Sequence, residues 1–179
     1  SDVYKRQLHG EMAINFGKNK ISGDSLYKAL FGKQLKYKFK SHVKNRLGSM
    51  EGELIGGNLS IIYSNLGVPS KEDWSNKVLF IEDLDEYLYH IDRMMIALKR
   101  SGRLENLAGL VVGGMTNMND NAVPFGKTAE EIIAAVTAEY KFPIAFGIKS
   151  GHLMENVALR LGAKVSCDVT EQGSALEFV

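Results

Sequence analysis

The sequence predicts an α/β fold: a small, mostly parallel sheet flanked by helices, with extra N-terminal strands and a C-terminal hairpin. Two observations carry this prediction. Apolar runs alternate with amphipathic segments across residues 78–148, in the order strand, helix, strand, helix, strand. The apolar runs are short and continuous, as expected of parallel strands buried on both faces. A chain of 179 residues is long enough to bury a core of this kind.

The N-terminal part of the chain predicts one helix followed by strands. Residues 21–32, "ISGDSLYKALFG", are typical of a short helix capped near Ser22 and stopped by Gly32. In 34–46, lysines alternate with apolar residues, which favours the solvated face of an amphipathic strand over a phosphate-binding surface. We expect 52–67 to be strand as well, with glycine turns joining it to its neighbours.

The remaining elements follow from the same patterns. Continuous apolar runs bounded by polar or glycine residues predict strands, and apolar residues at helical spacing predict helices. Thr128 with Glu131 three residues later forms the capping-box pattern of a helix start. The predicted strands are 76–84, 107–115 and 142–148, the predicted helices are 86–102 and 128–140, and 163–179 is the predicted closing hairpin.

Composition restricts the possible functions. The formal net charge is +1, so no overall field favours nucleic acid or an anionic membrane as a partner. Cys167 is the single cysteine, which excludes an intrachain disulfide and favours a reducing compartment. The sequence shows no apolar run of membrane-spanning length and no signal peptide. The four histidines and the cysteine lack metal-ligand spacing and no phosphate loop is present, so we expect neither a metal nor another cofactor.

Polar and glycine residues follow all three central strands. Glu82 and Asp83 end the first predicted strand, residues 113–114 are the Gly-Gly pair that ends the second, and 147–152 follows the third. Ligands of open α/β sheets bind at the carboxyl ends of the strands. These three strand ends are therefore expected to meet at one edge of the sheet and to form the candidate site.

Glu82 and His152 each allow two interpretations. Glu82 could be a helix N-terminal charge, although Asp83, Asp85 and Glu86 lie closer to the helix start and fit that role better. His152 could simply bond a loop carbonyl. Alternatively, His152 exchanges protons near neutral pH while a carboxylate from a neighbouring strand fixes its tautomer. Such a pair would still lack a nucleophile.

Serine motifs in the sequence do not supply that nucleophile. Residues 22–26, "SGDSL", contain a string found around the nucleophile of one esterase class, but here the string does not follow an apolar strand. We therefore interpret Ser25 as a residue of the first helical turn. The Gly-x-Ser-x-Gly elbow of the α/β-hydrolases does not occur in the sequence.

Several segments together resemble the LD-carboxypeptidases (muramoyltetrapeptide carboxypeptidases), a serine peptidase family that includes the microcin C immunity peptidases. The "LFIED" and "GH…N…LG" blocks are the most specific part of this resemblance, which covers almost everything after residue 7. The matching segments are "HGEMAINF" (9–16), "GGNLSII" (56–62), "VLFIEDLDEYLYHIDRMM" (78–95), "GLVVGGM" (109–115) and "PIAFGIKSGHLMENVALRLGAKV" (143–165).

The resemblance implies roles for three residues. The family uses a Ser–His–Glu triad in the chain order Ser, Glu, His. Glu82 matches the acidic member, His152 matches the base, and Asn58 of "GGNL" matches a position that lines the substrate cleft. The family's serine lies in an N-terminal domain that is expected to be absent here. The sequence departs from the family at Glu11, where a proline often stands.

The resemblance also implies a domain division and a function. Residues 1–7 look like a non-native scar, 8–50 would be an interdomain linker with the start of the C-terminal domain, and 51–179 would be that domain. The whole protein is expected to release terminal D-alanine from murein tetrapeptide by cleaving an L,D amide bond, without a metal. It would be a cytoplasmic homodimer that acts in cell-wall recycling, and the fragment alone would be inactive.

Two alternatives remain open. A microcin-type hydrolase would cleave a peptidyl–nucleotide conjugate and would need an aromatic clamp for the base, for which Trp74 is a candidate. A non-catalytic module would instead bind wall peptides and perform no chemistry.

Overall fold

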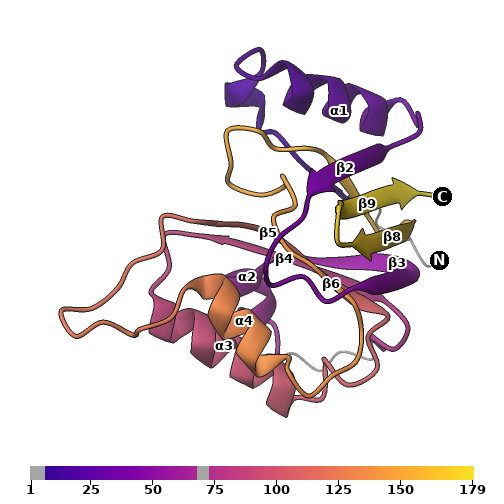
Figure 1. The fold of residues 1–179 in the computed structure, drawn as a ribbon. Coiled ribbons are helices and arrows are strands. Elements are labelled where there is room, and N and C mark those ends of the chain that lie inside the picture. Colours follow the sequence, from indigo (N-terminus) through magenta and orange to yellow (C-terminus); the bar gives the residue numbers. More distant parts are fainter. Residues whose placement is uncertain (1–6, 68–72) are drawn as a thin grey trace.

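The computed structural model describes residues 7–67 and 73–179. A seven-stranded mixed sheet and a separate two-stranded sheet are packed with helices (Figure 1). The predicted α/β fold, with its parallel strands, flanking helices, N-terminal strands and C-terminal hairpin, is confirmed. In chain order the elements are β1 (Gln7–His9), the 3-10 helix η1 (Ala13–Asn15), α1 (Lys20–Leu30), β2 (Lys36–Lys40), β3 (Gly48–Asn58), α2 (Leu59–Ser64), β4 (Val78–Leu84), α3 (Leu88–Arg100), β5 (Gly109–Thr116), α4 (Ala129–Val136), β6 (Ile144–Ala145), β7 (Leu159–Leu161), β8 (Lys164–Thr170) and β9 (Gly173–Phe178).

The parallel half of the large sheet consists of β3, β4, β5 and β6, which pair in that order. The helices α2, α3 and α4 connect these strands in sequence and lie together on one face of the sheet (Figure 1). Right-handed crossovers that all step the same way across a sheet fall on the same face. Because the four strands are parallel, their carboxyl ends all lie at one edge of the sheet.

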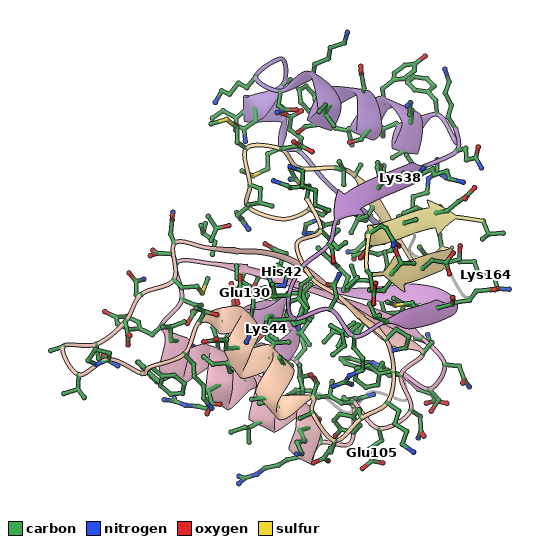
Figure 2. All side chains as sticks on the ribbon, viewed as in Figure 1. Lys38, His42, Lys44, Glu105, Glu130 and Lys164 are labelled. Atoms are coloured by element: carbon green, nitrogen blue, oxygen red, sulfur yellow. The ribbon has the colours of Figure 1, made fainter. Side chains whose placement is uncertain are left out.

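Antiparallel pairing completes the sheet on the far side of β3, in the order β2, β9, β8, β3. The β8–β9 hairpin is the predicted closing hairpin. β2 is the edge strand, and its lysines are exposed while Tyr37 and Phe39 are half-buried. Lys38 on β2 and Lys164 on β8 reach solvent in this half (Figure 2). The solvated-face interpretation of this segment is confirmed for β2.

Side chains of β4 alternate between two hydrophobic clusters, because successive strand residues point to opposite faces. Leu79 and Ile81 pack with the buried side chains of α3 and α4. Val78 and Phe80 pack on the opposite face with buried residues of β7, β8 and β9. By the same alternation Glu82 continues the second face.

The helix and strand boundaries differ from the predictions in two N-terminal segments. The cap of α1 is Asn19, whose side chain accepts the N–H of Ser22, so Ser22 lies inside the helix rather than at its start. The strand expected over 52–67 ends at Asn58 and continues as the helix α2. Asn58 causes this change, because its side chain accepts the N–H of Ile61 and caps that helix.

Other predicted elements are confirmed in type but are shorter. The capping box of Thr128 and Glu131 is present, and α4 ends eight residues later at Val136. The predicted strand 142–148 pairs with β5 only at Ile144 and Ala145. The strands β1 and β7 were not predicted.

The predicted scar, residues 1–7, lies outside the described residues except for Gln7, which starts β1 opposite Leu161.

Within residues 7–67 and 73–179, no helix combines the length and the apolar character that crossing a membrane requires.

The central position of β4 gives a stability prediction. Ile81→Ala should lower the free energy of unfolding by about 2–5 kcal/mol, because a fully buried side chain leaves a cavity. The same substitution at Ile61, which is 61% exposed on α2, should change it by less than about 0.5 kcal/mol. Urea unfolding of both variants measures the difference, and equal losses would contradict the assigned packing.

Candidate active site

Glu82 lies at the carboxyl end of β4, directly opposite Asn58 in the register with β3. Its side chain is only 1% exposed. Burial of an unpaired carboxylate is strongly unfavourable, so the surroundings must provide hydrogen-bond donors. These donors come from the loop 147–158 and from the N-terminal strand β1.

The loop 147–158 is fixed against the end of β5 by backbone hydrogen bonds. The N–H of Ile148 donates to the carbonyl of Val112, and the N–H of Gly114 donates to the carbonyl of Ser150. A Cβ at Gly113 would lie 2.4 Å from that same Ser150 carbonyl oxygen. The Gly-Gly pair of β5 therefore allows the loop to approach the strand closely.

The returning half of this loop is held by α1. The Ser22 hydroxyl accepts the N–H of Asn156, and the Ser25 hydroxyl accepts the N–H of Ala158 while donating to the carbonyl of Ser22. Ser25 lies one turn later than predicted, in the second turn of α1, and is 4% exposed. Its hydroxyl therefore organises the loop and is not presented to a substrate.

His152, in the loop 147–158, contacts Glu82 through both its side chain and its backbone. Its Nδ1 lies 2.8 Å from Glu82 Oε2, and its backbone N–H donates to the same oxygen over 3.3 Å. A carboxylate can only accept, so the hydrogen between the two belongs to Nδ1. The Nε2 atom makes no hydrogen bond within the described part of the chain, and the side chain is 43% exposed. His152 thus uses Nδ1 to contact Glu82 and leaves Nε2 available on its exposed side chain.

Gly151 makes this contact possible. Its φ is +113°, a conformation that favours glycine, and a Cβ there would lie 2.7 Å from Glu82 Oε2. The Asn156 side chain accepts the N–H of Gly151 over 3.0 Å and holds the turn. The asparagine four residues after His152 therefore closes the loop while the histidine remains available.

Glu82 is charged in this setting. Burial by itself would raise its pKa, but hydrogen bonds and positive charge from His9 and His152 outweigh burial and hold the pKa below its ordinary value. Asp83 points to the other face. Burial raises the pKa of Asp83 despite hydrogen bonds from Leu84, Asn58 and Ser60, and the nearby charge of Glu82 adds to that rise.

Asn58 lies at the same strand edge but its side chain is largely occupied. Its oxygen accepts from the Ile61 N–H and the Ser60 hydroxyl, and its amide nitrogen donates to Asp83 over 2.8 Å. The role of Asn58 in lining a substrate cleft stays a prediction.

Two further side chains of the described residues do not act as nucleophiles here. The Ser150 hydroxyl is fully buried and donates to the carbonyl of Val157 over 3.0 Å. Burial raises the pKa of Cys167 to about 12, so its sulfur remains a thiol at neutral pH. Across residues 7–67 and 73–179, no three or more His, Cys, Asp or Glu side chains are grouped to hold a metal ion.

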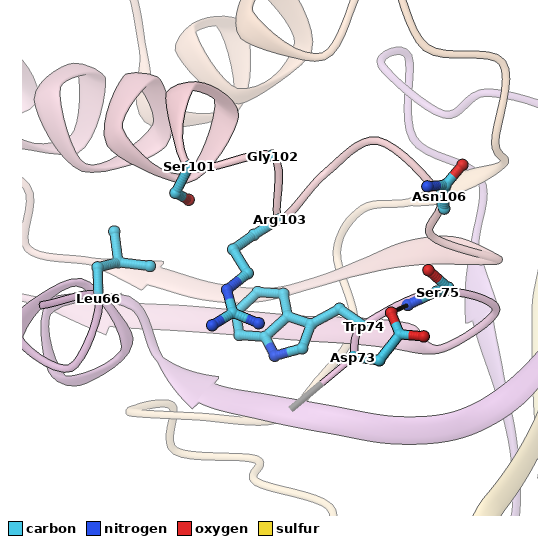
Figure 3. Close-up of a pocket in the computed structure, with 8 residues that line it drawn as sticks. All are labelled: Leu66, Asp73, Trp74, Ser75, Ser101, Gly102, Arg103 and Asn106. Carbon is cyan, nitrogen blue, oxygen red and sulfur yellow. Dashed lines mark hydrogen bonds between the residues drawn. The ribbon is translucent and has the colours of Figure 1, made fainter. Parts of the chain in front are cut away.

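Trp74 lies in a different part of the molecule. It precedes β4 and lines a small pocket of about 260 Å³ with Asp73, Ser101 and Arg103 (Figure 3). The guanidinium of Arg103 lies 5.0 Å from the centre of the indole ring. This pocket is at the amino end of β4, whereas Glu82 is at its carboxyl end.

Glu82 and His152 were predicted from the sequence to lie at one edge of the sheet. Two other residues of the site were not predicted. Gly151 carries no side chain, and its importance follows only from the close approach of Glu82. His9 lies far away in the sequence, yet its Nε2 is 3.6 Å from Glu82 Oε1. The His-Gly pair at 9–10 was a possible signal, because it stands in a segment that carries the family resemblance.

Gly151→Ala should destabilise the protein more than a matched glycine substitution. Gly126 also has a positive φ, +79°, but no atom lies within 4 Å of its Cβ position. We expect Gly126→Ala to lower the free energy of unfolding by about 1–2 kcal/mol from backbone conformation alone. Gly151→Ala should lose roughly a further 1–3 kcal/mol from the clash with Glu82. Equal losses of unfolding free energy in the two variants, measured by urea unfolding, would show that Gly151 is not in close contact with Glu82.

The lowered pKa of Glu82 makes stability depend on pH with a defined sign. A carboxylate whose pKa falls on folding stabilises the protein above its unfolded pKa of about 4.3, and this contribution is lost as the pH falls through the folded pKa. The stability advantage of wild type over Glu82→Gln should therefore shrink as the pH drops below about 5. Glu105→Gln, at an exposed loop position (Figure 2), is the control. The same pH profile for both variants, measured by urea unfolding, would argue against a charged Glu82.

Comparison with known proteins identifies the family of this chain. The family model for the LD-carboxypeptidase C-terminal domain matches residues 51–167. A probable murein peptide carboxypeptidase of Bacillus subtilis is 38% identical over 134 residues, which cover 73% of this chain and 41% of the relative. A putative carboxypeptidase of Synechocystis is 31% identical over 121 residues, covering 68% of this chain and 40% of the relative. The chain therefore spans about two fifths of the length of these curated relatives.

Solved structures share the fold. A muramoyltetrapeptide carboxypeptidase from Oxalobacter formigenes superposes with a TM-score of 0.86 at 23% identity, covering 97% of this chain and 60% of that one. The microcin C7 self-immunity protein MccF gives a TM-score of 0.78 at 19% identity, covering 96% and 60%. Because the family model spans most of the sequence, the chain belongs to the LD-carboxypeptidase family, of which it contains the C-terminal domain.

Proposed function

We propose that this chain carries the acid–base half of a serine-type LD-carboxypeptidase, with His152 as general base and Glu82 as the residue that orients it. The observation that carries the proposal is the contact between buried Glu82 and the Nδ1 atom of half-exposed His152, with Nε2 left free. This is the arrangement of base and acid in a hydrolytic triad. Membership in a carboxypeptidase family supports the same assignment.

In the proposed reaction, His152 Nε2 removes the hydroxyl proton of a serine as the serine oxygen bonds to the amide carbonyl carbon. The resulting imidazolium is stabilised by Glu82, which is already charged. His152 then gives this proton to the amine of the departing D-alanine as the C–N bond breaks. A water molecule, deprotonated by His152, hydrolyses the acyl-enzyme and regenerates the serine.

The proposed serine belongs to a segment outside this chain, as the family resemblance implies. Backbone N–H groups beside that serine would bind the oxyanion. Ser150 and Ser25 already use their hydroxyls inside the fold, as donors to the carbonyls of Val157 and Ser22. We therefore propose that the chain by itself does not hydrolyse peptides.

The proposed substrate is a murein tetrapeptide with a terminal D-alanine on an L-centre. The names of two similar proteins, a probable murein peptide carboxypeptidase and a muramoyltetrapeptide carboxypeptidase, support this class. A cytoplasmic homodimer that acts in cell-wall recycling belongs to the same proposal and rests on the family resemblance alone.

A peptidyl–nucleotide conjugate is the second candidate substrate. MccF, similar in fold, has been solved with glutamyl sulfamoyl guanosine and with aspartyl sulfamoyl adenosine. An aromatic clamp for the base would favour this reading. Trp74 does not supply one at the proposed site, because it lies at the opposite end of β4. We therefore prefer the murein peptide, and a module that binds wall peptides without chemistry is the remaining alternative.

The test joins this chain to the amino-terminal part of the Bacillus subtilis relative and measures D-alanine release from murein tetrapeptide. The joined protein should be active and the chain alone inactive. His152→Ala should lower turnover by roughly three to four orders of magnitude, and Glu82→Gln should lower it less because orientation is partly retained. Circular dichroism should show that both variants remain folded.

Ser64→Ala is the control, since this serine is exposed at the end of α2, its hydroxyl donates to the carbonyl of Ile61, and the variant should keep the turnover of the joined protein. Full activity in His152→Ala would refute the assigned base. Hydrolysis of an aminoacyl sulfamoyl adenosine but not of the tetrapeptide would favour the nucleotide conjugate. Tight binding of tetrapeptide by a folded but inactive protein would favour the binding module.

A further inference from the structure

A second histidine faces the catalytic carboxylate. His9 Nε2 lies 3.6 Å from Glu82 Oε1, while His152 engages the other oxygen, Oε2. The carboxylate of Glu82 is thus held between two imidazoles, and His9 is the described side chain that faces Oε1. His9 is 20% exposed, compared with 43% for His152.

The other ring nitrogen of His9 points toward the loop that carries His152. Its Nδ1 lies 3.4 Å from the hydroxyl oxygen of Ser150, which itself donates to the carbonyl of Val157. Ser150 stands two residues before His152. The His9 ring therefore lies between the Glu82 carboxylate on β4 and Ser150 in the loop that carries His152.

The fold fixes His9 in this place. It ends β1, and its register partner Leu159 lies in β7, the strand that directly follows the loop. The edge of the imidazole also packs on the ring of Phe80, with centroids 5.1 Å apart at 74°. Phe80 precedes Glu82 by two residues on the same face of β4. Backbone pairing and ring packing both direct Nε2 at the carboxylate.

We infer that His9 is a positioning residue that holds Glu82 from the side opposite His152. This inference rests on the proposed function only in naming His152 as the base. Both nitrogens of His9 are directed at protein atoms and its ring is mostly buried, so it does not contact substrate. It acts by fixing one carboxylate oxygen, which keeps the other on His152 Nδ1.

The physical reason is the burial of the carboxylate. A buried charged oxygen without a donor is strongly unfavourable, and a carboxylate can relieve this by rotating. A partial rotation would move both oxygens away from their present positions and weaken the bond to His152. The titratable groups that contact Glu82 are His9 and His152, and Asp83 is adjacent in sequence but points to the other face, so changing His9 alone leaves the other two in place.

Carbon NMR of the Glu82 side chain tests the inference in this chain, without requiring activity. His9→Ala should raise the pKa of Glu82, because a donor and a positive charge are removed. His9→Gln places an amide donor near Oε1 and should restore part of the lowering. His90→Ala removes a histidine that pairs with a different carboxylate, Glu86, and is the matched control.

An unchanged Glu82 titration in His9→Ala would overturn the inference, as would an equal shift in His90→Ala. If His9→Ala does not fold, His9→Gln and His9→Asn decide: a smaller rise in the pKa of Glu82 for His9→Gln than for His9→Asn supports the contact. A rise in the pKa of Glu82 that is as large in His9→Gln as in a folded His9→Asn would refute the inference, because the shorter side chain of asparagine reaches less far toward Glu82.

A kinetic readout in the joined protein separates positioning from binding. His9→Ala should lower kcat about tenfold with little change in KM, since a misplaced catalytic group loses rate rather than affinity. His9→Gln should recover most of that loss. A higher KM at unchanged kcat would overturn the inference. If the joined protein is inactive but His9→Ala raises the Glu82 pKa, the proposed function fails while the positioning role of His9 holds.

Discussion

The buried negative charge of Glu82 is the constraint around which the rest of the structure is arranged. Placing a carboxylate in the interior costs several kcal/mol unless donors surround it. Here the donors are far apart in the sequence: His9 comes from β1 and His152 from the loop after β6. The strand pairing of β1 with β7, the close approach of the loop to β5 and its attachment to α1 all bring these donors to one point. The contacts that complete the fold therefore also form the site.

Strand alternation explains why two adjacent carboxylates have different roles. Glu82 follows Val78 and Phe80 on the face that meets the loop, whereas Asp83 follows Leu79 and Ile81 on the helical face. Glu82 is charged and bonded to an imidazole. Asp83 instead accepts from Asn58 and the Ser60 backbone at the start of α2. A shift of one residue in β4 would exchange the two and remove the site.

The sequence predicted the central elements well because β4 and β5 are continuous apolar runs and α3 has clear helical spacing. It failed where local signals conflict with tertiary structure. The β-branched residues after Asn58 looked like strand, but the asparagine cap makes them a helix. The three-residue strands β1 and β7 depend on a partner about 150 residues away, which local pattern does not reveal. For the same reason the strand ends made Glu82 and His152 candidates, to which the family resemblance gave roles, whereas the contacts of His9 and Gly151 required coordinates.

The most direct test of this account is the tautomer of His152, measured by long-range proton–nitrogen NMR of the imidazoles in this chain at pH 8. If Glu82 holds His152 as described, the hydrogen resides on Nδ1 and Nε2 gives the signal of an unprotonated nitrogen. The Glu82→Gln variant should lose this preference. A hydrogen on Nε2 in the wild-type chain would contradict the account, because His152 would then have no free nitrogen to accept a proton from a serine.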